Sequence, residues 1–183
     1  MASNNPHYEA DPRSKVLSYI RTLPDTTNGA KGLIVEPRGL DIVWGNDTRY
    51  WRMPENKPAE LLQVCWLEVT CSIDIGTLKS ARLEKPQIGF KLSLSSDAFG
   101  WSGCPIYIMA KIGKKGKYFW KKVDLQAIRG NTQEFDIPED FCMDIVKDSP
   151  ASDEKLYFGL YEVWSGKWKG GLQIHHAFLR ESN

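Results

Sequence analysis

The amino-acid sequence predicts an all-β fold, an antiparallel β-sandwich of jelly-roll type with a short N-terminal helical extension. Two observations lead to this prediction. From Leu33 onward, apolar residues recur mostly at every second position, which is the period of a half-buried strand. The strands expected from this pattern follow one another at short spacing and are separated by glycine-containing turns, with little sequence of helical period.

The length and composition are those of a single globular domain with a short extension. The chain has 183 residues, of which 42% are hydrophobic and 26% charged, and its formal net charge is +1. A charge this small gives no overall field that would favour DNA or an anionic membrane. No apolar run approaches the roughly 18 residues of a membrane span, and residues 1–10 lack the apolar stretch of a signal peptide. We therefore expect a cytosolic protein.

Residues 1–35 are predicted to form the extension. Asp11 followed by Pro12 is a favourable helix start, because Asp caps the helix and Pro fits its first turn. Apolar residues then follow at helical spacing up to Leu23, before Pro24. This pattern predicts a short helix near 12–23, then a linker over 25–31, and a single domain over 36–183.

The strongest strand signal is the run from Leu62 to Ile75. From Cys65 onward its odd positions are apolar or cysteine, while its even positions include glutamate, threonine, serine and aspartate. One buried face and one wet face indicate an antiparallel sheet. The run is longer than a typical strand of about 5–6 residues, so we expect it to bend or to serve two sheets.

The other strands are predicted from the same alternation and from the turns between them. A hairpin turn over 113–116 joins two of them. In the last strand the alternation changes phase at His175 and His176, and a β-bulge there would return Ala177 and Leu179 to the core face. The remaining expected strands cover 40–44, 88–94, 106–112, 118–123, 156–164 and 168–180, and residues 138–141 can open one helical turn.

No set of catalytic or metal-binding residues can be recognised in the sequence. Of the three histidines, His175 and His176 are neighbours in a strand, so their side chains point to opposite faces unless the bulge turns them. A glycine-rich phosphate loop, a Gly-x-Ser-x-Gly elbow and a His-Glu-x-x-His motif are all missing. We therefore expect a binding protein rather than an enzyme, with no cofactor and no metal.

The four cysteines are expected to be reduced thiols. They form no Cys-x-x-Cys pair, and a cytosolic protein rarely keeps disulfides. Cys65 and Cys71 share one strand face, but in a straight strand they are roughly 20 Å apart, too far for a disulfide.

A lysine-rich hairpin allows two interpretations. Six lysines between Lys111 and Lys122 are interleaved with Tyr118, Phe119 and Trp120. Lysines commonly protect a solvated hairpin against edge-to-edge pairing, and that interpretation is favoured. The same mixture of cations and aromatic rings is used to bind single-stranded nucleic acid, so an RNA contact or a nuclear import signal is the alternative.

The stretch from Leu40 to Pro54 is the strongest candidate binding site. It begins as an apolar strand and breaks at residues 45–47, close to two tryptophans. Trp44 is in phase with the preceding apolar residues, so it belongs either to the core or to a binding face. Trp51 follows the break, and we expect it to be exposed at a loop or strand end. Flat aromatic faces beside hydrogen-bonding groups suit a sugar.

Polar side chains in the same break supply those hydrogen-bonding groups. Asn46, Asp47 and Arg49 would bond hydroxyls or an acetamido group beside an indole ring. The alternative is that Asn46 and Asp47 only form the turn.

Three separated motifs in this sequence, in the same order, resemble those of the plant phloem protein 2 family, which includes the tobacco-agglutinin-like lectins. The resemblance covers about 36–180. It is carried by residues 39–51 (Gly-Leu-Asp-Ile-Val-Trp-Gly-Asn-Asp-Thr-Arg-Tyr-Trp), by 59–69, and by 160–163 together with 168–172.

The resemblance implies a β-sandwich lectin domain that binds N-acetylglucosamine oligomers (chito-oligosaccharides) and N-glycan cores. It further implies a cytosolic and nuclear protein, abundant in phloem sap in many members, that commonly forms a homodimer and meets N-glycosylated proteins. The family's two sugar-binding tryptophans match Trp44 and Trp51, and an implicated late glutamate matches Glu162. Two positions depart from the family pattern, Lys155 where an acidic residue is expected and His176 where a small residue is expected.

Together these observations predict a non-catalytic lectin whose candidate sugar-binding residues are Trp44, Asn46, Arg49, Trp51 and Glu162. Trp51 is expected to stack directly on the sugar, while Trp44 supports the site from beneath. The competing hypothesis is an RNA- or protein-binding structural component of phloem sap, which would use the hairpin lysines.

Overall fold

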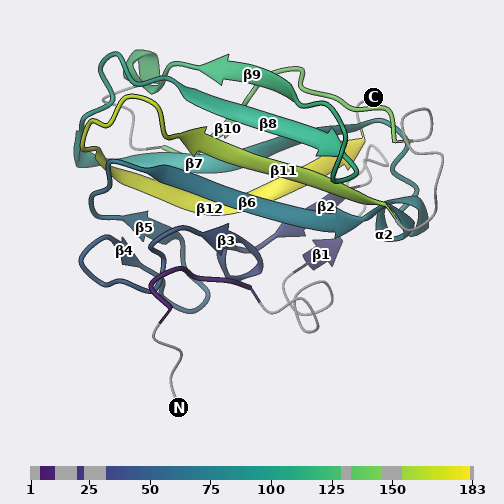
Figure 1. The fold of residues 1–183 in the computed structure, drawn as a ribbon, viewed down its shortest axis with the longest axis horizontal. Helices are drawn as coiled ribbons and strands as arrows, with labels where there is room; N and C mark the ends of the chain where they lie inside the picture. Colours follow the sequence, from purple (N-terminus) through teal and green to yellow (C-terminus); the bar gives the residue numbers. More distant parts are fainter. Residues whose placement is uncertain (1–4, 11–19, 23–31, 129–132, 146–153, 182–183) are drawn as a thin grey trace.

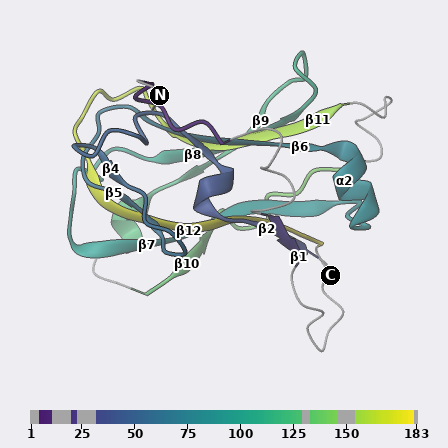
Figure 2. The same cartoon turned by 90° about the horizontal axis from the view of Figure 1, so that it is seen from below.

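The computed structural model describes residues 5–10, 20–22, 32–128, 133–145 and 154–181. These residues form two antiparallel sheets packed face to face, so the predicted all-β sandwich is confirmed (Figure 1, Figure 2). The jelly-roll type stays a prediction.

The described residues of the smaller sheet form five strands. Their order across the sheet is β3 (Asp41–Ile42), β6 (Leu67–Asp74), β11 (Lys155–Glu162), β8 (Ile106–Ile112) and β9 (Phe119–Val123). β3 and β9 are therefore the two edges. β8 and β9 form the hairpin that the sequence predicts.

The larger sheet contains seven strands within the described residues and is organised around the long strand β12 (Gly170–Glu181). One side of β12 pairs with β7 (Pro86–Phe99), and β7 in turn pairs with β10 (Phe135–Ile137). Along its other side β12 pairs with two short strands, and each of these pairs in turn with one further short strand. These are β1 (Ile20–Thr22) with β2 (Gly32–Val35), and β4 (Trp51–Arg52) with β5 (Ala59–Leu61).

The core lies between the sheets and follows the predicted alternation. In β6, residues 67, 69, 71 and 73 are buried and the even positions between them are less buried. Within the predicted run from Leu62 to Ile75 the only strand is β6, which lies in the smaller sheet, and residues 62–66 connect it to β5 of the larger sheet. The run therefore does not serve two sheets. A short helix, α2 (Ile75–Ser80), follows β6, and beyond Ile75 the sequence analysis predicted no element there; Ile75 and Leu78, three residues apart, are both buried in the core.

The predicted bulge in the last strand is confirmed. The register between β12 and β7 shifts between Ile174 and His176, and Ala177 and Leu179 return to the core. Both histidines line one groove on the outer face of the larger sheet, because a bulge adds a residue to one strand and turns its side chain.

The predicted N-terminal helix is wrong in the part that the structure describes. Residues 20–22 form β1, which pairs with β2 through Ile20 opposite Val35. Pairing with a neighbouring strand therefore overrides the helical spacing read from the sequence. Residues 11–19 and 23, the rest of the predicted helix, lie outside the described residues.

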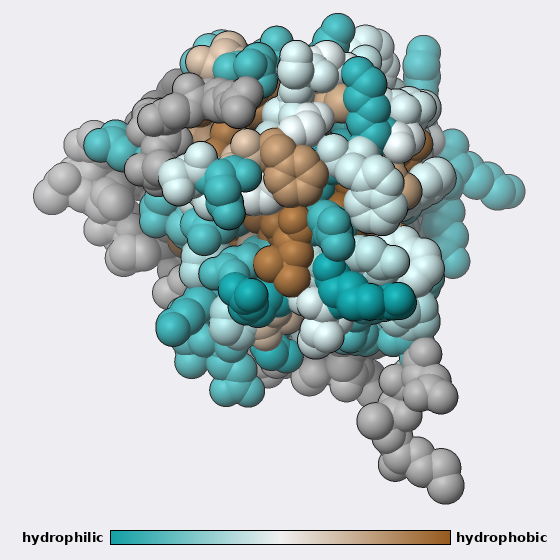
Figure 3. Space-filling model, turned by 90° about the vertical axis from the view of Figure 1, so that its left-hand side faces the viewer, coloured by the Kyte–Doolittle hydropathy of each residue, from teal (hydrophilic) through white to brown (hydrophobic). Residues whose placement is uncertain are grey.

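The two ends of the sandwich differ. α2 lies at one end, and three connections gather at the other, which we call the loop end: 62–66, 100–105 and 163–169 (Figure 2). They are tied together there, because Val64 and Lys169 exchange backbone hydrogen bonds and the indole of Trp101 donates to the carbonyl of Gly170 at 3.0 Å. Figure 3 faces this end and shows brown and white side chains at the centre of a mostly teal surface. Short 3-10 helices at η1 (Pro37–Gly39) and η2 (Leu125–Ile128) complete the fold.

Candidate binding site

Trp44 leaves the strand phase because β3 ends two residues earlier. The chain turns over 43–46, and Trp44 has a φ of 65°, in the left-handed region that side chains other than glycine rarely occupy. Its backbone N–H donates to His7 Nδ1 at 3.0 Å, which ties the turn to the N-terminal residues. The indole is only partly buried, so Trp44 is neither a core residue nor a fully exposed one. Strain of this kind often marks a functional position.

Trp51 is buried, and the prediction that it is exposed is wrong. It belongs to β4, where Trp51 pairs with Leu61 of β5. Successive side chains of a strand point to opposite faces, and the exposed side chain is that of Arg52, which pairs with Glu60 at 2.9 Å. Trp51 therefore faces the core and is 2% exposed. Its indole N–H has no hydrogen-bond partner within the described part of the chain.

Three aromatic rings lie in a row next to one another, and we call Trp44, Tyr50 and Trp168 the platform. The ring centroids of Trp44 and Tyr50 are 5.7 Å apart in an edge-to-face arrangement, and those of Tyr50 and Trp168 are 6.3 Å apart. Trp168 is 51% exposed. The ring contact between Tyr50 and Trp168 links the 43–50 turn to the loop end. The backbone adds a second link, because the carbonyl of Tyr50 accepts a hydrogen bond from the N–H of Leu62.

Asn46 and Arg49 border the platform, and part of the hydrogen-bonding capacity of each side chain is used within the protein. The amide nitrogen of Asn46 donates to the carbonyls of Asn5 and His7, which fixes its orientation. The guanidinium of Arg49 forms an ion pair with Asp47 at 2.7 Å and lies 5.2 Å from the ring centre of Tyr50. The hydrogen bonds from Arg49 hold the pKa of the Asp47 carboxyl below its ordinary value. Arg49 is nevertheless exposed and keeps donors for a ligand.

Glu162 is buried at the end of β11 and organises the loop that follows. Its carboxylate forms an ion pair with the fully buried Lys169 and accepts hydrogen bonds from the backbone N–H and the hydroxyl of Ser165, at 3.1 and 2.9 Å. Lys169 also donates to the carbonyl of Lys167 at 2.8 Å. These bonds fix the 163–168 connection, which carries Trp168 to the platform.

The structure thus brings together part of the predicted site. Trp44, Asn46 and Arg49 lie on one turn, Trp51 supports that turn from the core, and Glu162 acts from the other side by holding a neighbouring loop. Sequence reasoning did not assign Tyr50 and Trp168 to the site. Two signals in the sequence could have pointed to Trp168: the unusual count of seven tryptophans, and its position just after a Ser-Gly-Lys turn.

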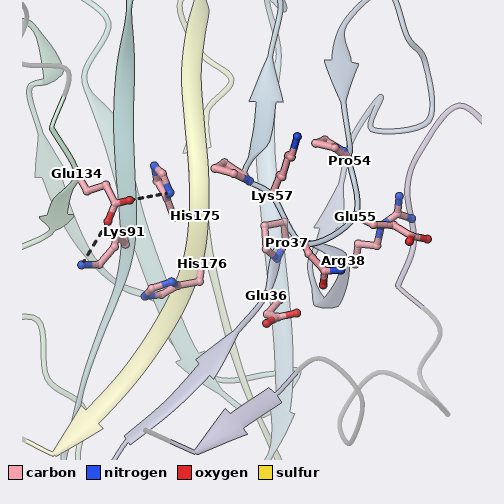
Figure 4. A pocket seen from close by; sticks show the side chains of 12 residues that line it. Glu36, Pro37, Arg38, Pro54, Glu55, Lys57, Lys91, Glu134, His175 and His176 are labelled. Carbon is pink, nitrogen blue, oxygen red and sulfur yellow. Dashed lines mark ion pairs between the residues drawn. The ribbon is translucent and has the colours of Figure 1, made fainter. Parts of the chain in front are cut away.

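A polar groove of about 620 Å³ lies on the outer face of the larger sheet, beside the bulge (Figure 4). His175 and His176 line it together with Lys91 and Glu134, and a carboxylate oxygen of Glu134 is 3.3 Å from Nδ1 of His175. Burial lowers the pKa of His175, and Lys91 lowers it further while Glu134 opposes the shift. Acidic and basic side chains are mixed in this groove, and its lining contains no aromatic wall.

The contacts from Ser93 to His175 and from His175 to Glu134 run in the order of a hydrolase triad, but the serine is buried. Ser93 Oγ lies 2.7 Å from Nε2 of His175 and also donates to Gln173 at 2.9 Å. Its side chain is 3% exposed and does not line the groove, so a substrate has no path to this hydroxyl. The arrangement holds the bulge in place.

Other chemistry-bearing groups stay separate in the described residues. They contain no group of three or more histidine, cysteine, aspartate or glutamate side chains placed to hold a metal ion. None of the four cysteines, all of which are described, forms a disulfide. None of the helices described is long and apolar enough to cross a membrane.

Comparison with known proteins identifies the family. The family model described as phloem protein 2 matches residues 30–181, which include the platform, both β4 and β5, and the whole of β12. The chain belongs to the phloem protein 2 family. Trp44, Trp51, Glu162 and Trp168 all lie within the matched residues.

Relatives in the phloem protein 2 family come from Arabidopsis thaliana. Phloem protein 2-like A9 is 44% identical over 165 residues, which are 84% of this chain and 89% of that protein. Phloem protein 2-like A1 is 27% identical over 157 residues, covering 78% of this chain and 58% of the relative. F-box protein PP2-B1 is 31% identical over 104 residues, covering 54% of this chain and 30% of the relative. These relatives are named as phloem proteins and F-box proteins.

Proposed function

We propose that this protein is a non-catalytic lectin that binds N-acetylglucosamine oligomers (chito-oligosaccharides) and the cores of N-glycans. The observation that carries the proposal is the platform, a row of three aromatic rings at the open end of the sandwich, one of them half exposed. Membership of the phloem protein 2 family supports it, because the tobacco-agglutinin-like lectins that the sequence resembles belong to the same family.

The platform suits the chemistry of a sugar. A pyranose ring has an apolar C–H face that packs on an aromatic ring, and Trp168 offers such a face to solvent. Arg49, which lies over the Tyr50 ring, and the amide oxygen of Asn46, two residues after Trp44, would bond hydroxyl or acetamido groups. Each polar contact replaces a bond to water and yields little net energy, so stacking should dominate the affinity.

Trp51 and Glu162 act in this proposal as positioning residues. Trp51 is anchored in the core and its backbone N–H donates to the carbonyl of Asp47, while Glu162 fixes the loop that carries Trp168. The partners would be N-glycosylated proteins and free chito-oligosaccharides, bound by a homodimer in the cytoplasm and nucleus. The names of the relatives support a place in the phloem.

Calorimetry with chitotriose tests the proposal. Trp168→Ala and Trp44→Ala should each weaken binding by about tenfold or more, because each removes one ring of the platform. Phe119→Ala is the matched control, since Phe119 is an equally exposed aromatic residue on β9 and should leave the affinity unchanged. Wild-type affinity in both platform variants, with circular dichroism unchanged, would contradict the proposal.

A second candidate function is RNA binding through the β8–β9 hairpin. Tyr118, Phe119 and Trp120 are all exposed there among lysines, and the ammonium of Lys111 lies 4.7 Å from the ring centre of Tyr118. Binding to RNA through these lysines should weaken steeply as salt rises, whereas sugar binding should not. A salt titration with a single-stranded RNA oligomer therefore separates the two functions.

A further inference from the structure

A second group of aromatic rings lies on the other side of the 163–168 loop, away from the platform. Tyr107, Trp120 and Trp164 wall an open groove of about 450 Å³. The ring centre of Tyr107 is 4.9 Å from that of Trp164 and 5.6 Å from that of Trp120, both edge to face. Trp164 is 61% and Trp120 59% exposed, the two most exposed large hydrophobic side chains among the described residues.

The fold builds this groove from neighbouring strands of the smaller sheet. Tyr107 and Met109 occupy outward-facing positions of β8, since the positions between them are buried. Trp120 of edge strand β9 stands opposite Met109, and Trp164 follows the end of β11 beside Tyr107. Cross-strand neighbours on one face are in contact, so the aromatic walls do not depend on a ligand for their position.

Polar groups at one end of the groove come from the last residue of β11 and from the 163–168 loop that follows it. Glu162 and Ser165 line it there. Oε1 of Glu162 accepts the Ser165 N–H, while Lys169 and the Ser165 hydroxyl occupy Oε2. A carboxylate has about four acceptor positions, so Oε1 keeps one for a ligand hydroxyl. The lining contains no lysine, arginine or histidine.

We propose that this groove is a second carbohydrate site, which takes a single neutral pyranose unit of an oligosaccharide between Trp120 and Trp164. Flat aromatic walls with one hydroxyl acceptor suit a ring that is apolar on its faces and polar at its edges. The volume falls within the range of about 300–1,000 Å³ that is usual for small-ligand clefts.

The charge of the lining favours a sugar over a nucleic acid. Single-stranded nucleic acid needs cations along its backbone path, whereas the lining of this groove contains no lysine or arginine, and its one carboxylate, Glu162, is paired with the buried Lys169. The hairpin lysines lie outside the lining. The site goes beyond the proposed platform, because Trp164 and Trp168 stand on opposite flanks of one turn and contact different aromatic partners, Tyr107 and Tyr50.

Indole N–H signals in ¹⁵N–¹H spectra of the full chain test the proposal. The Trp120 and Trp164 signals are first identified from Trp120→Ala and Trp164→Ala, which remove exposed side chains and should leave the fold intact. Chitotriose and cellotriose are then titrated into the wild-type protein and into Trp168→Ala. We expect both signals to shift in a saturable way in both proteins, and Trp164→Ala to raise the Kd reported by Trp120 about tenfold or more.

Two results would overturn the groove site. One is that neither indole signal responds to either sugar at millimolar concentration; the other is that both respond to a single-stranded RNA oligomer and not to sugars. The platform is judged separately from the Trp168 and Trp44 signals. A platform that binds beside a silent groove therefore refutes only the second site, and a responding groove beside a silent platform refutes only the first.

Discussion

The segment 44–51 and the segment 162–169 use aromatic residues in opposite ways. Each contains two tryptophans around a short turn. In the first segment one tryptophan is buried and the other half-buried, so the core holds the turn. In the second segment both tryptophans are exposed, and the buried anchor is the ion pair of Glu162 with Lys169. The exposed aromatic surface thus rests on buried anchors, and this protein uses one apolar anchor, Trp51, and one charged anchor, the ion pair of Glu162 with Lys169.

Removing the charged anchor should produce the largest effect. Glu162→Ala leaves the Lys169 ammonium buried without its counter-charge and should lower the free energy of unfolding by about 3–5 kcal/mol. Urea denaturation followed by circular dichroism measures the change. The double variant Glu162→Gln with Lys169→Met, which removes both charges, should recover much of the loss. If Glu162→Ala alone unfolds at the wild-type midpoint, the ion pair is not the anchor of this segment.

Removing the apolar anchor, Trp51, should lower the free energy of unfolding somewhat less. Trp51→Ala leaves a cavity in the core, and we expect a loss towards the lower end of about 3–5 kcal/mol because the two-residue strand β4 can relax. Trp51→Phe should cost clearly less, since it keeps most of the packing and removes an indole N–H that has no partner among the described residues. The same urea experiment compares them, and equal losses in the two variants would show that packing at Trp51 contributes little.

The contrast between the two segments also explains what the sequence could and could not predict. Two features were predicted because they are local patterns. One is the alternation that buries residues 67, 69, 71 and 73, and the other is the bulge at His175 and His176. The burial of Trp51 depends on pairing with β5, and the row from Tyr50 to Trp168 joins two distant parts of the chain. Neither contact leaves a periodic signal, so reasoning from phase misplaced Trp51 and did not find Trp168.

The smallest expected effect concerns the backbone of the turn at Trp44. With a φ of 65°, this residue lies in a region that costs an L-residue roughly 1–2 kcal/mol and glycine almost nothing. Trp44→Gly should therefore be more stable than Trp44→Ala by about 1 kcal/mol, the reverse of the usual order in regular structure, although both remove the indole from the platform. Thermal unfolding of the two variants measures the difference.

The comparison of Trp44→Gly with Trp44→Ala separates two roles of the residue. Both variants lack the ring, so both should bind chitotriose about equally weakly if Trp44 contributes by contact with the sugar. If Trp44→Gly binds as well as the wild type while Trp44→Ala does not, the conformation of the turn matters and the indole does not. Trp168 would then be the stacking ring of the platform, and the segment 44–51 would serve only to position it.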